Sequence, residues 1–389
     1  MKALRAKVVK VLLGCLLAFC LLGGGLVFHF RDPHLLLTLE KPPGGFPRAW
    51  YSLTGSPVTP DVRSWLDSTA WDFSPNGNQI LTVYPARYEM GFRVLGIKVW
   101  DAATGRELLQ ASPPPASDYV AFSSDGRHLI SEGLNGQLNF LDAQNGSVAF
   151  TLADPLPPDL ADRLAHNRGS IAVSPNGKLV AVPRGLWITA KPFIEIWDIA
   201  SRKKVLTLEN VFYAPWSLDH RRRSAIFSPD SKQLLVIDKQ TYDLRLCDVE
   251  TGETVRMLKG FAVDPMCIDY SRNGKRIIAT SGGRDAKRDA KLWNADTGEE
   301  TPIKLNGDSN SEWRHVALSP DGNRLAKACG SEVKVWDLAS GDLLLTLKGF
   351  PGFGTRPLVF SGDGNKLAGG AWFGRTIKVW DITPPSPRQ

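Results

Sequence analysis

Apolar and polar residues alternate in short runs along most of the chain. In Val333-Lys334-Val335, for example, every second side chain is apolar, and a Trp-Asp pair ends the run. A period of two is typical of a β-strand with one buried and one exposed face. Turn residues separate the runs throughout. The pattern therefore predicts an all-β chain with almost no helix after the first 30 residues.

One pattern of two parts recurs along residues 35–382. Its first part is an apolar strand ending in Ser-Pro-Asp-Gly or a variant, in which Pro presets φ, Asp or Asn bonds the turn backbone and Gly accepts a positive φ. The turns begin at Ser74, Ser123, Ser174, Ser228, Ser271, Ser319 and Ser361. The second part is a strand that ends in Trp-Asp or a variant. Its copies are Trp100-Asp101, Leu141-Asp142, Trp197-Asp198, Cys247-Asp248, Trp293-Asn294, Trp336-Asp337 and Trp380-Asp381.

Seven copies in register predict seven units, each of four antiparallel strands named a to d from the axis outward. A single unit cannot bury both of its faces, so neighbouring units must stack into a closed ring. The fold class is a seven-bladed β-propeller. We expect the strand-c tryptophans, such as Trp336, to lie in the core between blades.

The last repeat stops after its third strand, at Ile382, and a Pro-rich tail follows at residues 383–389. Its fourth strand must therefore come from elsewhere. Leu35-Leu36-Leu37-Thr38-Leu39 repeats the fourth strand Leu343-Leu344-Leu345-Thr346-Leu347 letter for letter. We expect residues 35–40 to close the last blade.

These repeats resemble the WD-repeat family in its bacterial style, and the resemblance covers about residues 35–382. It implies a propeller fastened by its N-terminal strand. The Gly-His dipeptide of the family is missing, with Gly260-Phe261 and Gly349-Phe350 near its place, and the aspartate before strand c is mostly absent. The hydrogen-bonded tetrad of the family should therefore be largely missing.

The first 30 residues have a different composition. Residues 1–10 hold four cations, and residues 11–28 carry no charge over a length close to that of a bilayer core. The positive-inside rule then predicts a signal-anchor helix at 11–30, with residues 1–10 in the cytoplasm and the propeller on the extracytoplasmic side of the inner membrane. The alternative is a cleaved signal peptide and a secreted or periplasmic protein.

The a–b and c–d turns are short and share one face of the ring, here called the short-turn face. The d–a and b–c connections share the other, the long-loop face, and the longest are 41–69, 84–96, 111–119, 153–170, 183–193, 209–223 and 281–290. Long loops on a rigid scaffold often carry binding residues, and Trp, Tyr and Arg are enriched at binding hot spots. Arg184 is one of the cations assigned to these loops. The partner-binding candidates are Trp187, Tyr213, Trp216, Arg221, Arg222, Arg223, Trp313, Trp372 and Arg375. The alternative is that the aromatic residues only pin their own loops.

The remaining chemistry favours a binding platform for a protein or peptide. The formal net charge of +7 owes four units to Lys2, Arg5, Lys7 and Lys10, so basicity is no argument for nucleic acid. The five cysteines form no CxxC pair and the six histidines no zinc signature, so neither metal nor cofactor is expected. Nucleotide-binding and hydrolase motifs are missing too. The alternatives are a hydrolase or lactonase with an axial site built from several blades, marked by three or more carboxylates or histidines, and a structural envelope protein.

Overall fold

The computed structural model describes residues 35–40, 70–88, 91–111, 120–133, 136–152, 171–184, 192–212, 225–259, 265–281, 289–308, 313, 315–349, 355–371 and 376–383. Every regular element in these ranges is a β-strand, as the alternation predicts. The described part of the chain contains no helix that could span a bilayer. The expected anchor at 11–30 lies outside the described residues, as do residues 1–10 and 384–389.

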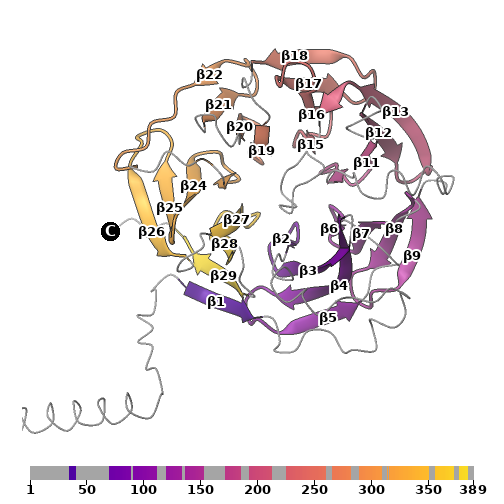
Figure 1. Cartoon of the computed structure of the whole chain (residues 1–389), viewed down its shortest axis with the longest axis horizontal. Coiled ribbons are helices and arrows are strands. Elements are labelled where there is room, and N and C mark those ends of the chain that lie inside the picture. The colour runs from indigo at the N-terminus through magenta and orange to yellow at the C-terminus, as the bar shows by residue number, and fades with distance from the viewer. Residues whose placement is uncertain are drawn as a thin grey trace, which may run out of the picture. The chain divides into compact units, whose positions relative to one another are not determined.

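Seven antiparallel sheets follow one another around a ring, which confirms the predicted number of blades (Figure 1). Strand a lies nearest the axis and strand d at the rim. Blade 1 comprises β2 (Ala70–Phe73), β3 (Gln79–Tyr88), β4 (Gly91–Asp101) and β5 (Glu107–Ala111). Blade 2 comprises β6 (Val120–Phe122), β7 (His128–Glu132), β8 (Leu138–Asp142) and β9 (Val148–Leu152). Blade 3 comprises β10 (Ala172–Val173), β11 (Leu179–Arg184), β12 (Phe193–Asp198) and β13 (Lys203–Glu209).

The second half of the ring has the same plan. Blade 4 comprises β14 (Val211–Phe212), β15 (Ala225–Phe227), β16 (Gln233–Asp238), β17 (Leu244–Asp248) and β18 (Thr254–Leu258), and both β14 and β15 pair with β16. Blade 5 comprises β19 (Pro265–Tyr270), β20 (Arg276–Ser281), β21 (Ala290–Asn294) and β22 (Glu300–Thr301). Blade 6 comprises β23 (Val316–Leu318), β24 (Arg324–Cys329), β25 (Glu332–Asp337) and β26 (Leu343–Lys348). Blade 7 comprises β27 (Thr355–Phe360), β28 (Lys366–Ala371), β29 (Thr376–Asp381) and β1 (Leu35–Glu40).

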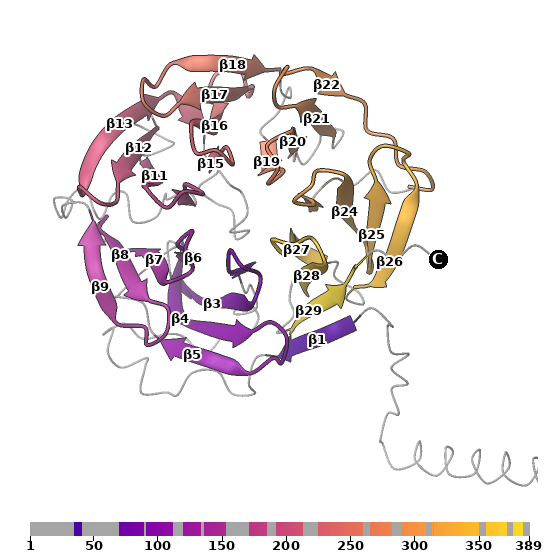
Figure 2. The ribbon, with the colours of Figure 1, turned by 180° about the vertical axis from the view of Figure 1, so that it is seen from behind.

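The N-terminal strand closes the ring as predicted. Strand β1 pairs antiparallel with β29, with Leu37 opposite Val379 and Leu39 opposite Ile377. Both views of the ring show β1 at the rim beside β29, so the two ends of the propeller sequence meet in one sheet (Figure 2). This pairing covers an edge of the last blade that would otherwise lie open.

Two of the predicted long loops contain strand instead. Residues 84–96 were expected as a b–c loop, but β3 and β4 continue through most of that range and pair as far as Tyr88 opposite Gly91. The register shifts between Tyr84 and Pro85, and the two strands remain paired beyond this irregularity. Within the expected loop 209–223, Val211 and Phe212 form β14 and pair with the end of β16.

The core is divided among the gaps between blades. Seven buried apolar clusters are present among the described residues, and each joins two neighbouring blades. Phe73 and Ile80 of blade 1 pack with Ala368 and Val379 of blade 7, which closes the circle. Trp293, Trp336 and Trp380 are at most 1% exposed, as expected for the strand-c tryptophans. Trp100 and Trp197 are half-buried against their clusters.

The indole N–H groups bond to different acceptors in different blades. Trp100 donates to Thr82 Oγ1 at 2.8 Å, Trp197 donates to Glu195 Oε2 at 3.2 Å, and Trp336 donates to the carbonyl of Asn306 at 3.1 Å. These blades therefore do not repeat one shared hydrogen-bonded tetrad.

Candidate functional site

Most of the residues expected to bind a partner lie outside the described part of the chain. Trp313 is described, and it belongs to the connection between β22 and β23 on the long-loop face. The candidates outside the described residues are Trp187, Tyr213, Trp216, Arg221, Arg222, Arg223, Trp372 and Arg375.

Trp313 is half-buried, and a cation of blade 6 covers its ring. It packs against the apolar cluster between blades 5 and 6. The Nζ of Lys327 lies 4.2 Å from the ring centroid, and the same Nζ lies 2.5 Å from Asp308 Oδ2. The Lys327 side chain is 0% exposed. Burying a lysine is costly unless an anion and an aromatic face compensate, as they do here. Trp313 thus helps to fix the connection from β22 to β23 onto β24.

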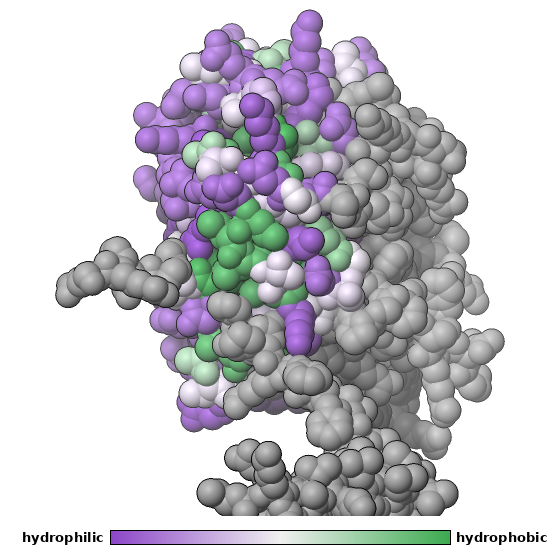
Figure 3. Space-filling model, turned by 90° about the vertical axis from the view of Figure 1, so that its left-hand side faces the viewer, coloured by the Kyte–Doolittle hydropathy of each residue, from purple (hydrophilic) through white to green (hydrophobic). Residues whose placement is uncertain are grey.

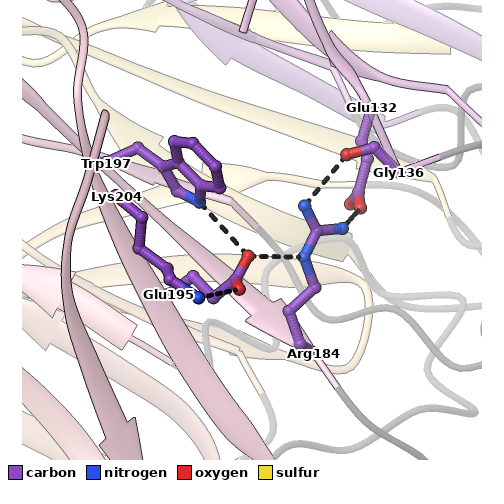
Figure 4. Close-up of polar contacts among 6 residues, drawn as sticks. All are labelled: Glu132, Gly136, Arg184, Glu195, Trp197 and Lys204. Atoms are coloured by element: carbon purple, nitrogen blue, oxygen red, sulfur yellow. Dashed lines mark hydrogen bonds and ion pairs between the residues drawn. The ribbon is translucent and has the colours of Figure 1, made fainter. Parts of the chain in front are cut away.

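A second buried charged cluster joins blades 2 and 3 (Figure 4). Arg184 forms ion pairs with Glu132 of blade 2 and with Glu195 of its own blade, the second through Nε at 3.2 Å. Its Nη2 also donates to the carbonyl of Gly136 at 2.9 Å. Lys204 Nζ completes the cluster at 3.1 Å from Glu195 Oε1.

Glu195 is kept charged in this cluster. Burial would raise its pKa, but Arg184 and then Lys204 hold the pKa of this carboxyl below its ordinary value. Arg184 was assigned to a long loop, but it is the last residue of β11, and its side chain is 5% exposed. Its ion pairs join blades 2 and 3 next to the long-loop face.

Sequence reasoning did not find Glu132, Asp308 or Lys327. Lys327 could have been found from the sequence, because a lysine in a strand position that should face the core indicates a buried ion pair. Its partner Asp308 could not have been found in this way, because it lies in a connection that has no repeat pattern. Arg184 and Glu132 are 52 residues apart and come together only when blades 2 and 3 stack.

The short-turn face is uniform. In each a–b turn the first serine hydroxyl donates to the aspartate or asparagine two residues on; Ser228 Oγ lies 2.6 Å from Asp230 Oδ1. The same Ser228 Oγ accepts the N–H of Gln233 at 2.9 Å. Blade 4 has Ser231 where most turns have glycine, and Ser231 adopts the left-handed conformation with φ of 64°.

An axial cavity opens among these turns. It has a larger compartment of about 510 Å³ against blades 1 to 5 and a smaller one of about 200 Å³ against blades 5, 6, 7 and 1. The residue that follows each turn serine lines one or both: Pro75, Ser124, Pro175, Pro229, Arg272, Pro320 and Gly362. Two carboxylates also line the cavity, Asp72 and Asp269. An axial enzymatic site was expected to show three or more carboxylates or histidines, and the described lining does not reach that number.

Comparison with known proteins gives several distant relatives, and no family model matches. The cilia- and flagella-associated protein 52 of Chlamydomonas reinhardtii is 23% identical over 333 residues, 72% of this chain and 49% of that protein. WD repeat-containing protein 1 of Xenopus tropicalis is 23% identical over 223 residues, 57% of this chain and 33% of that protein. The APC/C activator protein CDH1 of Saccharomyces cerevisiae is 25% identical over 230 residues, 50% of this chain and 39% of that protein. The chain spans about half or less of the length of these relatives.

Proposed function

The chain belongs to the WD-repeat β-propeller family, as its seven blades and its relatives show, and on that premise we propose that it is a non-enzymatic scaffold for a protein or peptide partner. The partner binds the long-loop face, and an N-terminal helix holds the propeller at a membrane. One relative is named as an activator of the APC/C and another as a protein associated with cilia and flagella.

The contrast between the two faces carries this proposal. The short-turn face repeats one tight hydrogen-bonded turn, whereas the long-loop face carries the connections that vary in length. Buried charged clusters support the long-loop face at two places, through Arg184 and through Lys327. A rigid base under variable connections is the arrangement in which loops recognise partners.

The partner site itself is proposed from the candidate residues. Aromatic and guanidinium contacts would come from Trp187, Tyr213, Trp216, Trp372, Arg221, Arg222, Arg223 and Arg375. Such side chains dominate many protein interfaces. Trp313 is assigned a supporting role, because Lys327 already covers its ring.

Membrane attachment is proposed from the N-terminal sequence. Four cations precede the uncharged run at 11–28, and about four residues separate Phe30 from β1. Such a spacer reaches at most about 15 Å. Strand β1 lies at the rim, where Leu36 is 51% exposed, and Leu344 of the neighbouring blade is 48% exposed. Apolar residues gather on the side of the ring that carries β26 (Figure 3), which suits a rim close to lipid.

Affinity capture from solubilised membranes, followed by identification of the captured proteins, tests the proposal. We expect Trp216→Ala combined with Arg222→Ala to weaken capture at least tenfold, because hot-spot side chains carry most of the binding free energy. The melting temperature should stay nearly unchanged. Asn145→Ala, in a c–d turn of the short-turn face, is the control and should capture normally. If the double variant captures the same proteins equally well, the partner binds at the rim or on the short-turn face instead.

A further inference from the structure

The axial cavity of the short-turn face has an asymmetric mouth. In four blades the residue after the turn serine is proline, which offers no side-chain donor. Blade 5 has Arg272 at this position and blade 7 has Gly362. At the position after the serine, the mouth therefore carries one cation and no carboxylate.

Arg272 reaches across the mouth. Its Nη1 donates to the carbonyl of Pro75 at 3.2 Å, although blades 5 and 1 are not neighbours in the ring. Arg272 and Pro75 line both compartments, so this bridge stands between them. A guanidinium has five N–H donors, and the bond to Pro75 uses one of them. Donors therefore remain for a ligand.

Gly362 makes the bridge possible. A Cβ at position 362 would collide with Arg272 Nη1 and would lie 2.8 Å from the carbonyl oxygen of Pro75. Any other residue there would have to displace the guanidinium. Two of the three departures from proline, Arg272 and Gly362, thus act together and place a cation across the mouth of the cavity.

The larger compartment pairs this cation with one carboxylate. Asp72 of β2 lines it, and Asp72 Oδ1 accepts the N–H of Phe73 at 2.9 Å. Most of the other lining residues are apolar, among them Ala121, Val173 and Ile226. A volume of about 510 Å³ falls within the usual range for small-molecule sites.

We propose that this compartment binds a small zwitterionic ligand with an apolar body, of the class of an apolar dipeptide. Arg272 would take the ligand carboxylate and Asp72 its ammonium group. A simple anion would be repelled by Asp72 and a simple cation by Arg272, whereas a zwitterion matches both. This site lies on the opposite face from the proposed partner site and does not depend on it.

Calorimetric titration of the whole protein with leucyl-phenylalanine tests the proposal. Two blocked probes separate the charges: the N-acetyl form lacks the ammonium group, and the C-terminal amide lacks the carboxylate. We expect the parent dipeptide to bind about tenfold more tightly than either blocked form, the order of effect for one charge-assisted hydrogen bond.

Variants assign each charge. Arg272→Gln should weaken the parent and the N-acetyl form about tenfold but leave the amide unchanged, and Asp72→Asn should do the reverse. Gly362→Ala should mimic Arg272→Gln without removing a charge, because it displaces the guanidinium. Arg127→Gln is the matched control, since Arg127 lies in the equivalent turn of blade 2 and pairs with Asp125. Its affinity should equal that of the wild type.

Thermal unfolding of each variant shows whether it is folded. If Asp72→Asn is unfolded, the affinities of Arg272→Gln and Gly362→Ala still test the proposal. The proposal is overturned if the dipeptide does not bind at millimolar concentration. It is also overturned if Arg272→Gln and Gly362→Ala bind the parent as tightly as the wild type does.

Discussion

At the scale of single residues, the tryptophans of strand c hold neighbouring blades together. Trp336 is 0% exposed, and its N–H bonds to the carbonyl of Asn306. We expect Trp336→Ala to lower the free energy of unfolding by about 3–5 kcal/mol, the usual loss for a buried large aromatic side chain. Denaturant unfolding measures this loss. Val148→Ala, at a 48% exposed site, is the control and should change the free energy by less than about 0.5 kcal/mol. A loss below 1 kcal/mol for Trp336→Ala would contradict the packing described here.

The ion pair of Lys327 and Asp308 makes a different prediction. Removing the anion takes this carboxylate away from an ammonium group whose side chain is 0% exposed, whereas removing the cation leaves a carboxylate that is 10% exposed. We expect Asp308→Ala to cost about 3–5 kcal/mol of unfolding free energy. Lys327→Met should cost clearly less, because an apolar side chain of similar length still packs against Trp313. Chemical unfolding of both variants checks the order, and the reverse order would show that Asp308 is not the main partner of Lys327.

The turn carboxylates predict a loss of stability in acid. Burial would raise the pKa of Asp125, but hydrogen bonds from Ser123 and Arg127 bring the pKa down to about 2. The pKa values of Asp230, Asp321 and Asp363 are lowered by the corresponding bonds. A depressed pKa in the folded state means that the stabilisation is present above about pH 4 and is lost as the pH falls toward 2.

The melting temperature should therefore fall steeply between about pH 4 and pH 2. Replacing Asp125, Asp230, Asp321 and Asp363 together by asparagine, which blades 1, 3 and 5 already use, should flatten this dependence. The same slope in the variant would assign acid sensitivity to other groups.

At the scale of elements, strand β1 completes the last blade and thereby closes the ring. It forms the outer strand of blade 7, pairs with β29 and contributes Leu35 to the cluster between blades 6 and 7. We expect deletion of residues 31–40 to lower the melting temperature strongly and to promote aggregation, because the edge of β29 is then unpaired. Deletion of residues 31–34 alone is the control and should leave the melting temperature nearly unchanged. Equal stability of both deletions would show that β1 does not fasten the ring.

The strands could be predicted from the sequence because their signals are local. The turn serines, the Trp-Asp pairs and the repeated Leu-Leu-Leu-Thr-Leu segment set the blade number and the closing strand. The range 84–96 was predicted wrongly, because its length suggested a loop while its backbone continues the ladder to Tyr88. The site was harder to predict. Arg184 meets Glu132 only when the neighbouring blades 2 and 3 stack, and Arg272 meets Pro75 only after the ring has closed.

At the scale of the whole molecule, the proposed anchor predicts how the ring faces the membrane. In every blade strand d begins at a short c–d turn, so the tether would reach the rim of the short-turn face. We expect that face to tip toward lipid and the long loops to point away from it. Cysteines introduced at Asn145 and Ser217 should both react with a membrane-impermeant reagent in spheroplasts, and Ser217 should react faster. Equal rates would indicate a freely tumbling ring, and protection of both sites would place the propeller in the cytoplasm.

The central claim is that a protein partner binds the long-loop face. Site-specific photo-crosslinking in intact cells tests it most directly, with a photoreactive residue at Ser217 on that face or at Asn145 on the other. The account predicts one dominant protein adduct from Ser217, lost when Arg222→Ala is added, and no such adduct from Asn145. An adduct from Asn145 alone, or the same adduct from both positions, would contradict it.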